Sequence, residues 1–440
     1  MKIKISKNLL ELSKIFPEKL YVVGGYVRNS ILKIKTDDID ICSKLKYQEV
    51  ESLLNNSKYK IVAKSKKLGT MYILCGKEKY EYTTFRSETY DDSGKHRPTN
   101  VEFVDDLYKD AYRRDFTINA IYYDILGKKI VDPFNGICDI KNKVLKEIRS
   151  EDNPLKYSVF IDDGLRILRL VRFASELCFK VEEETLNNAI KYIDRLNDIY
   201  PERKKEELLK ILNSENKYKN IKVLNKSNKT DEQIVTKILD KKEYIINYFT
   251  KKFVAKNKLD YALELLNKLK ILKYFGLNIL NVNYNYVKSF GLEGFLIDLI
   301  NSNYINYLEI EKFLNDYQFS NKNYLNSLVR SYVELKDNGI DLEIIIKNFS
   351  NLKNIKKYLK DNKNYNLIIK YEKFIIKNKI PVSLKELSLK GNDIFSVVEN
   401  KEEIGLILNT LLKECQNSLV KNKKIDLQKR AYDIINKNRN

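Results

Sequence analysis

Apolar residues near the start of the chain fall into short runs divided by polar turns, a pattern typical of a sheet with helices between its strands. The run at 20–23 stops at Gly24 and Gly25, and apolar residues at helical spacing and then a second apolar run follow. This order predicts strand, glycine turn, helix and strand. The same reasoning predicts helices at 1–17 and 46–55, strands at 69–75, 79–85 and 101–104, and a hairpin turn at Gly76.

Apolar positions from residue 162 onward recur at the spacing of helices, and strand signals are no longer seen. The apolar side of a helix predicted at 162–177 is formed by Leu165, Leu168, Val171, Ala174 and Leu177. A helix at 201–212, a polar connection at 213–231 and successive helices over 267–380 are also predicted. With only 14 glycines and 6 prolines in 440 residues, helix breakers are scarce. The sequence predicts an α+β fold, a small mixed sheet with helices followed by a helical remainder.

The formal net charge of +21 indicates an acidic partner, and nucleic acid is the leading candidate because lysine and arginine neutralise phosphates. Part of this excess has an alternative source, since a genome rich in A and T encodes many lysines and asparagines. Five cysteines are scattered without CxxC spacing, which predicts neither a zinc site nor a disulfide framework. The sequence shows no apolar run that would span a bilayer and no signal peptide, so a cytoplasmic protein without membrane contact is expected.

Residues that suit a phosphate group and a metal ion follow the first predicted strand. Gly24 and Gly25 let the backbone approach a ligand, the next helix directs N–H groups toward it, and Arg28 adds a fixed positive charge. Asp38 and Asp40 lie two positions apart on a predicted strand and therefore project from the same side. Two carboxylates beside a phosphate pocket suit a pair of Mg²⁺ ions. Taken singly, these features are also common as plain turns, helix caps or solvated side chains.

Two further segments carry candidate residues. Glu81 would add a third carboxylate if its strand lies beside the one with the two aspartates, and a solvent-facing glutamate is the alternative. Arg114, Asp115 and Asn119 lie within a few residues of each other and suit phosphate and ribose hydroxyl groups. Surface charges are the alternative explanation for the basic pair at 113–114.

Asp163 and Arg166 are three residues apart, so on a helix their side chains would lie side by side. An ordinary surface ion pair is one interpretation of this spacing. The other is recognition of a nucleobase, because a carboxylate and a guanidinium together match the donor and acceptor edge of cytosine or adenine. Uracil and guanine present the opposite pattern and would leave buried groups unpaired.

Six motifs occur in order over about 21–212, and they are GGYVRN, DDID, EYTTFRSE, RRDFTINA, DDGLRILRLVRFA and PERKKEELLKIL. Together they resemble the motifs of class II, bacterial-type tRNA nucleotidyltransferases, the CCA-adding enzymes. That family includes bacterial poly(A) polymerases and is related to DNA polymerase beta. A weaker likeness to the tail of CCA-adding enzymes lies at 387–414. The sequence departs from the family at Asn29, at Asp162 and at Gly164, where the family has Asp, Glu and Pro, and Gly164 is expected to cost some helix stability.

The resemblance implies a polymerase-beta-like nucleotidyltransferase head at 1–145 and a helical neck at 146–215 that recognises the base. A helical body at 216–320 and a helical, tRNA-binding tail at 321–440 would follow. It also implies that Asp38 and Asp40 bind Mg²⁺ and are catalytic together with Glu81. The nucleotide-binding residues implied by the resemblance are Gly24, Gly25, Arg28, Arg114, Asp115, Asn119, Asp163, Arg166, Arg169 and Arg172.

By the same resemblance, the expected activity is template-independent addition of the 3'-terminal CCA sequence to tRNA from CTP and ATP, with release of pyrophosphate. Poly(A) synthesis and addition of only CC or only A are the alternatives, and a tRNA-binding protein without catalysis is a more remote one. In this family CC-only enzymes tend to have a shortened loop after the TTFR motif. The full-length connection at 87–100 therefore favours complete CCA addition, while the sequence predicts no oligomeric state.

Overall fold

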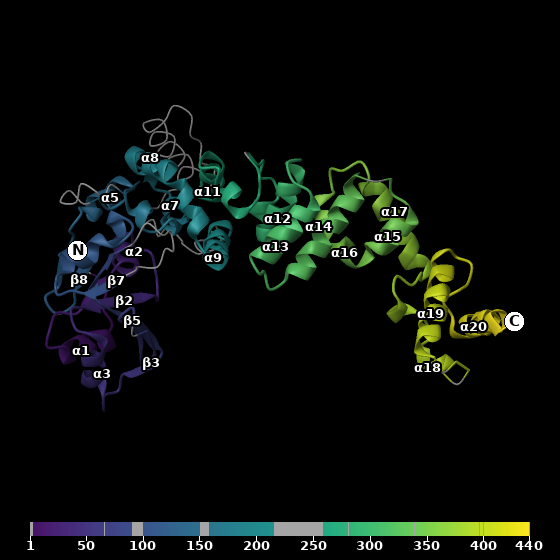
Figure 1. Cartoon of the computed structure of the whole chain (residues 1–440), viewed down its shortest axis with the longest axis horizontal. Helices are drawn as coiled ribbons and strands as arrows, with labels where there is room; N and C mark the ends of the chain where they lie inside the picture. Colours follow the sequence, from purple (N-terminus) through teal and green to yellow (C-terminus); the bar gives the residue numbers. More distant parts are fainter. Residues whose placement is uncertain are drawn as a thin grey trace, which may run out of the picture. The chain divides into compact units, whose positions relative to one another are not determined.

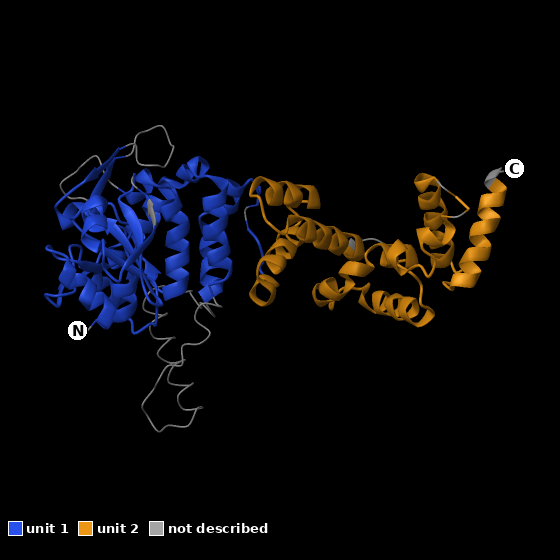
Figure 2. Ribbon diagram, turned by 90° about the horizontal axis from the view of Figure 1, so that it is seen from below, with its two compact units in different colours: residues 1–284 blue, residues 285–440 orange. Residues whose placement is uncertain are grey.

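The computed structural model describes residues 3–65, 67–89, 100–149, 158–214, 258–279, 281–337, 339–395, 397–398 and 400–439. The chain divides into two compact units, residues 1–284 and residues 285–440 (Figure 2). The loop at 90–99 and most of the predicted connection at 213–231 lie outside the described residues. No helix in the described part of the chain is long and apolar enough to cross a membrane.

A seven-stranded mixed sheet forms the core of the first unit (Figure 1). Its strands are β1 Tyr21–Val23, β2 Ile39–Ser43, β3 Lys60–Ser65, β4 Thr70–Cys75, β5 Glu78–Thr84, β8 Tyr122–Asp124 and β9 Lys129–Val131. They lie in the order β3-β4-β5-β2-β1-β8-β9, with β4 and β5 forming the predicted hairpin. β1 is antiparallel to β2 and β8, whereas β2 and β5 are parallel and pair Asp40 with Glu81.

Helices cover this sheet and continue into a helical part of the same unit. They are α1 Lys7–Ile15, α2 Gly25–Ile31, α3 Tyr47–Leu54, α4 Leu107–Tyr112, η1 Thr117–Asn119, α5 Gly136–Asn142, α6 Val159–Asp162, α7 Leu165–Leu177, α8 Glu183–Lys191, η2 Ile193–Asp198, α9 Pro201–Leu212, α11 Lys258–Lys268 and η4 Ile271–Phe275. α7 packs against both α9 and α11 (Figure 1). α9 begins with a proline, which suits the first helical position because its missing N–H would have no partner there.

Gly24 makes the turn between β1 and α2, as predicted. Its φ of +71° and ψ of −129° belong to a region that residues with a side chain rarely adopt. A Cβ atom at this position would also point toward the Arg114 guanidinium and the Asp40 carboxylate, at 3.6 and 3.8 Å. The turn therefore requires glycine for its backbone conformation and for the space beside those two side chains.

The prediction of one continuous helix at 162–177 is wrong. Asp163 leaves α6 in an extended conformation, with φ of −146° and ψ of 105°, and α7 begins only at Leu165. The Asp163 carboxylate accepts the N–H of Leu165 at 3.0 Å, which caps the new helix. Asp163 and Arg166 therefore do not lie side by side on one helix surface. Gly164 precedes the helix, so it does not carry the expected cost of a glycine in a helix interior.

Several short strands were not predicted, and the expectation that only helices follow residue 162 is wrong, because residues 180–181 form a strand. β9 extends the main sheet, and β10 Val144–Leu145 pairs in parallel with β11 Lys180–Val181. The predicted strand at 101–104 is confirmed as β7 Asn100–Phe103, and it pairs with β6 Arg86–Thr89, which was not predicted. Strands of two to four residues are too short to show the alternation of apolar and polar positions on which prediction depends.

The described residues of the second unit form helices, as predicted for this part of the chain. They are α12 Val287–Asn301, α13 Tyr307–Asp316, α14 Lys322–Asp337, α15 Leu342–Lys347, α16 Phe349–Ile355, η5 Lys356–Tyr358, α17 Tyr365–Asn378, η6 Leu384–Glu386, α18 Gly391–Ile394, α19 Lys401–Gln416 and α20 Lys424–Arg439. With the mixed sheet of the first unit, this arrangement confirms the predicted α+β fold.

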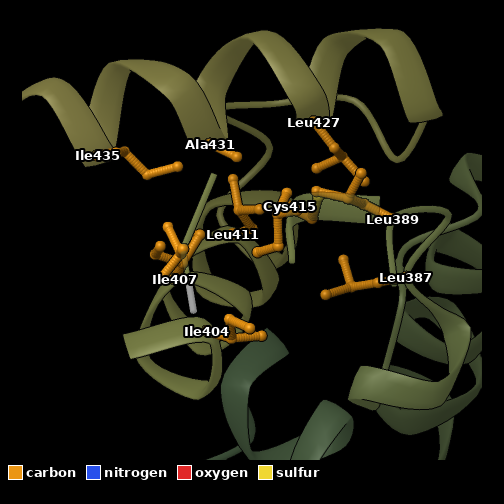
Figure 3. Packing of buried hydrophobic residues seen from close by; sticks show 11 residues of the cluster. Leu387, Leu389, Ile404, Ile407, Leu411, Cys415, Leu427, Ala431 and Ile435 are labelled. Carbon is orange, nitrogen blue, oxygen red and sulfur yellow. The ribbon is translucent and has the colours of Figure 1, made fainter. Parts of the chain in front are cut away.

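A separate small core joins α19 to α20 near the end of the chain (Figure 3). Leu411 and Cys415 on α19 lie against Leu427 of α20. An ion pair between Arg430 and Glu414, at 2.7 Å, also joins the two helices. The buried residues of this core are Leu387, Leu389, Ile394, Val398, Ile404, Ile407, Leu411, Cys415, Leu427, Ala431 and Ile435.

Replacing Gly164 by alanine is expected to destabilise the first unit by ~1–3 kcal/mol, the usual cost of forcing an extra carbon into a packed site. A Cβ atom there would lie 2.5 Å from the backbone oxygen of Arg195. Urea unfolding and hydrogen exchange of the α7 amides measure the effect. Gly405→Ala is the matched control, because a Cβ in that part of α19 meets no atom within 4 Å and should stabilise by up to ~1 kcal/mol. Unchanged protection of α7 in Gly164→Ala would contradict the packing argument.

Candidate active site

A cavity of about 1230 Å³ lies within the first unit, where the β1–α2 turn, the start of β2, the segment after α4 and the start of α7 meet. It contains all but one of the residues predicted to form the site. These lining residues are Gly24, Gly25, Arg28, Asp38, Asp40, Arg114, Asp115, Asn119, Asp163, Arg166, Arg169 and Arg172. Segments far apart in the sequence are thus brought to one site, and Glu81 is the predicted residue that does not line it.

The lining of the cavity is strongly basic. Eight arginines and three lysines contribute to it, against six aspartates and glutamates. Such a surface favours an anion with several charges, as a triphosphate has. The prediction missed the cationic residues Lys35, Lys67, Arg86, Arg113, Arg203 and Lys210. Arg86 and Arg203 belong to the TTFR and ER motifs, so the motif match was the signal that would have identified them.

Asp38 and Asp40 form an acidic pole in this basic cavity. Burial, together with the charges of Asp38 and Glu81, raises the pKa of the Asp40 carboxyl to about 6. Arg114 and Arg169 act in the opposite direction but do not cancel the rise. A divalent cation stabilises two carboxylates that lie close together, and carboxylate oxygens are ligands that Mg²⁺ prefers. The donor set therefore fits Mg²⁺, although the described residues contain no cluster of three acidic, histidine or cysteine side chains that would hold a metal unaided.

Glu81 lies next to Asp40 in the parallel pairing of β2 and β5. This neighbouring position is the condition under which Glu81 was expected to add a third carboxylate. Its negative charge contributes to the raised pKa of Asp40. It does not line the cavity, however, and belongs to no metal-binding cluster among the described side chains. The structure thus brings Glu81 close to Asp40 in the sheet but not to the cavity wall.

A chain of polar contacts links α2, the 115–119 segment and α7. Arg28 donates to the side-chain oxygen of Asn119, whose amide donates to Asp115 at 3.0 Å. Asp115 also accepts from Arg169 at 2.7 and 2.8 Å. Burial favours the neutral acid, but Arg169 and the Asn119 amide outweigh it and lower the pKa of Asp115 to about 2. These four side chains therefore hold one another in fixed positions at the cavity wall.

Asp110 is a fully buried carboxylate that the sequence analysis did not identify. It accepts from Arg113 at 2.7 Å, from Arg114 at 3.1 Å and from the Tyr122 hydroxyl at 2.7 Å. Burial opposes ionisation, but Arg113 and Arg114 outweigh it and lower the pKa of Asp110 to about 2. Its sequence neighbourhood is an ordinary short helix, so only its position three and four residues before the two arginines was a signal.

Asp163 and Arg166 both line the cavity, but they do not form the side-by-side pair predicted for a helix. Arg166 donates to the backbone oxygens of Val159 and Arg113, at 3.1 and 2.6 Å. The Asp163 carboxylate instead accepts from Arg203 at 2.9 Å. The break between α6 and α7 explains this change, because Asp163 is extended and precedes α7, so it does not lie one helical turn from Arg166.

Phe173 lies among three arginines of the same wall. The guanidinium carbons of Arg28, Arg169 and Arg172 are 5.0, 5.1 and 4.2 Å from the centre of its ring. Arg172 is also paired with Glu207 of α9 at 2.7 Å. The negative face of an aromatic ring attracts cations, so Phe173 reduces the repulsion among guanidinium groups that lie close together.

Two family models match parts of this chain that include the site. Residues 20–146 match the poly A polymerase head domain, and residues 178–228 match a probable RNA and SrmB-binding site of polymerase A. The segment that matches the head domain model contains the sheet and most of the residues that line the cavity.

Among relatives, the CCA-adding enzyme of Staphylococcus epidermidis is 37% identical over 207 residues, which are 47% of this chain and 49% of that protein. The CCA-adding enzyme of Lactobacillus helveticus is 41% identical over 192 residues, 43% of this chain and 45% of that protein. The chain therefore spans about half the length of the curated relatives that it matches. These matches confirm the resemblance to CCA-adding enzymes that the motifs indicate.

Solved structures resemble the chain over almost its whole length. The CCA-adding enzyme of Bacillus stearothermophilus in complex with CTP has a TM-score of 0.60 and 21% identity, and the match covers 98% of this chain and 97% of that one. The Thermotoga maritima CCA-adding enzyme complexed with tRNA has a TM-score of 0.51 and 18% identity, and the match covers 99% of both chains. At these identities the likeness shows a shared fold.

Asp40→Asn is expected to stabilise the metal-free protein by ~1–3 kcal/mol at pH 7.5, because the raised pKa means that folding disfavours the ionised carboxyl. This cost is absent below the unfolded pKa near 4 and complete above the folded value of about 6. The advantage of the variant should therefore shrink as the pH falls from 7.5 to 5. Urea unfolding with a chelator at several pH values measures it, and the exposed Asp37→Asn is the control. A pH-independent difference would contradict this origin.

Proposed function

We propose that this protein adds the 3'-terminal CCA sequence to tRNA from CTP and ATP without a nucleic-acid template. The observation that carries the proposal is the composition of the cavity lining. Two neighbouring carboxylates, Asp38 and Asp40, line it together with several arginines. Asp163 and Arg166 also line it, and their carboxylate and guanidinium suit the edge of a base. The relatives named CCA-adding enzymes, and the structures of such enzymes in complex with CTP and with tRNA, support the same activity.

In the proposed reaction, the 3'-hydroxyl oxygen of tRNA bonds to the α-phosphorus of the nucleotide, and the bond to the β-phosphate breaks to release pyrophosphate. Asp38 and Asp40 would hold two Mg²⁺ ions, which when bound activate the hydroxyl and neutralise charge at the α-phosphate. The raised pKa of Asp40 fits this role, because burial and the neighbouring carboxylates make its ionised form costly until a cation compensates the charge. Glu81, next to Asp40 in the sheet, is proposed to support the acidic pole.

The triphosphate would lie against the β1–α2 turn. Gly24 and Gly25 line the cavity without side chains, so the backbone is open to a phosphate, and Arg28 adds positive charge. Arg114, Asp115 and Asn119 are proposed to position the nucleotide and its ribose. The low pKa of Asp115 keeps this carboxylate ionised as an acceptor for a hydroxyl group throughout the neutral range.

Base selection is proposed for Asp163 and Arg166, with Arg169 and Arg172 on the following turns of α7 also binding nucleotide. Asp163 would accept from the exocyclic amino group that cytosine and adenine share, and Arg166 would donate to the neighbouring ring nitrogen. Two of the N–H groups of Arg166 hold backbone oxygens, and a guanidinium has five, so donors are left for the base. In this way a protein edge would take the place of a template base.

The remaining chain is proposed to bind tRNA. We retain the predicted division into a head at 1–145, a neck at 146–215, a body at 216–320 and a tail at 321–440 as part of this proposal. The net charge of +21 supports contact with the sugar-phosphate backbone of RNA, which is largely independent of sequence.

Poly(A) synthesis is a second candidate, because residues 20–146 match the poly A polymerase head domain. The experiment that separates the two uses purified protein, tRNA ending at the discriminator base, each labelled nucleotide in turn, and sequencing of the product. We expect two cytidines and then one adenosine, with UTP and GTP unused. Long A tracts would instead identify a poly(A) polymerase. Products that stop at CC, or that receive only A, would identify a CC-only or an A-only enzyme.

Asp38→Ala and Asp40→Ala are each expected to lower nucleotide addition by ~10³-fold, because the transition state loses the charge compensation that a metal ligand secures. Single-turnover addition of CMP to tRNA measures the loss, and filter binding should show nearly unchanged affinity for tRNA. Asp37→Ala is the control, since this exposed neighbour does not line the cavity. Activity close to wild type in either of the first two variants would rule out the proposed mechanism.

A further inference from the structure

Arg203 reaches from α9 into the cavity and binds the carboxylate of Asp163. Its Nη2 atom donates to Oδ2 of Asp163 at 2.9 Å. Both residues line the cavity, and they come from separate elements forty residues apart in the sequence. This is the interaction through which α9 contacts the residue that the proposed function assigns to base selection.

Asp163 lies outside both helices, so helix geometry does not restrict the orientation of its carboxylate. The carboxylate lies on the extended residue between α6 and α7, where the side chain is free to rotate unless other groups hold it. Two groups do so from different directions, because Oδ1 accepts the N–H of Leu165 at 3.0 Å and Oδ2 accepts from Arg203. A carboxylate has about four lone-pair directions, so two such bonds fix its plane and leave acceptor capacity for an amino group.

Arg166, the expected neighbour of Asp163, does not provide this support. Its guanidinium donates to the backbone oxygens of Val159 and Arg113, and it also pairs with the Asp162 carboxylate at 3.6 Å. Arg203 is also placed differently from the buried arginines of the wall, since 40% of its side chain is exposed compared with 8% for Arg166. Removing it should therefore leave the fold intact.

We infer that Arg203 is a positioning residue for base selection, which holds the Asp163 carboxylate in the orientation that accepts the amino group of cytosine or adenine. This inference rests on the proposed function and deepens it. Without Arg203, Asp163 keeps a single anchor and the carboxylate turns. Misplacing a group by about 1 Å typically costs on the order of 10²-fold in rate, and an unmatched buried acceptor is what penalises the wrong base.

Four variants test the inference in single-turnover nucleotide addition: Arg203→Ala, Arg203→Lys, Asp163→Ala and the double alanine variant. Arg203→Ala should lower the ratio of kcat/KM for CTP over UTP by ~10–100-fold, mainly by raising KM for CTP. Arg203→Lys should restore part of the ratio, because an ammonium reaches the carboxylate but lacks the planar fork. The double variant should lose no more than Asp163→Ala, since Arg203 acts through Asp163.

Inhibition by inorganic tripolyphosphate separates positioning from simple phosphate binding. An arginine that only orients Asp163 leaves this inhibition constant within about 2-fold, whereas a phosphate contact raises it together with KM. Arg195→Ala is the matched control, because this arginine of η2 lies near α7, does not line the cavity, and pairs with Asp198 at 3.8 Å. Far-UV circular dichroism and melting curves establish that each variant is folded.

The inference is overturned if Arg203→Ala keeps the wild-type ratio of CTP over UTP, if tripolyphosphate inhibition weakens as much as CTP use, or if the two alanine substitutions are additive. Failure of the proposed function has a different signature, because the wild-type protein would then add no nucleotide to tRNA. In that case, the affinities of wild type and of Arg203→Ala for CTP and for UTP, measured by calorimetry, still test the inference. Equal selectivity of the two proteins in binding would overturn the inference separately.

Discussion

Buried carboxylates hold the arginines of the cavity in place, and the form of the site depends on these ion pairs. Asp110 is completely buried beneath Arg113 and Arg114, and Asp115 pairs with Arg169. An unpaired guanidinium would be costly to desolvate, and several of them side by side would repel one another. Paired with carboxylates, they form a wall of fixed charges that needs little rearrangement when an anion arrives, and such preorganised charges are effective in catalysis.

α7 explains how so many charges reach one wall. Arg166, Arg169 and Arg172 are spaced three residues apart, so they follow one side of the helix. Twelve of its thirteen residues are buried, including two of these arginines, because α9, α11, η2 and the β10–β11 pair pack against it. A helix in such a position is usually apolar on all sides. Here the polar side is turned into the cavity, where carboxylates and Phe173 compensate the charges.

The two ends of the cavity have opposite electrostatic needs. Around Asp38 and Asp40, burial and the neighbouring negative charges disfavour the ionised carboxylates, and they raise the pKa of Asp40. Along α2 and α7 positive charge is in excess. In the proposed function, a nucleoside triphosphate with its metal ions would supply a cation to the first region and phosphates to the second. A metal–nucleotide complex would then match this charge distribution better than either part alone.

Features that depend on neighbouring residues could be predicted from the amino-acid sequence. Apolar periodicity located β1, α2, β2 and the β4–β5 hairpin, and Gly24 marked the turn because a positive φ favours glycine. The motifs identified twelve of the residues that line the cavity, since residue type and short spacing carry that signal. Most of the site and the α+β fold were predicted in this way.

The contacts between residues that are distant in the sequence were not predictable, because they depend on the folded arrangement. This arrangement paired Asp163 with Arg203, placed Glu81 beside Asp40 but outside the cavity, and buried Asp110 beneath two arginines. It also interrupted the helix predicted at 162–177. A local pattern specifies the face on which a side chain lies, whereas its partner depends on how separate elements pack. The free energy of burying a charge is set by that packing, so it cannot be obtained from spacing along the chain.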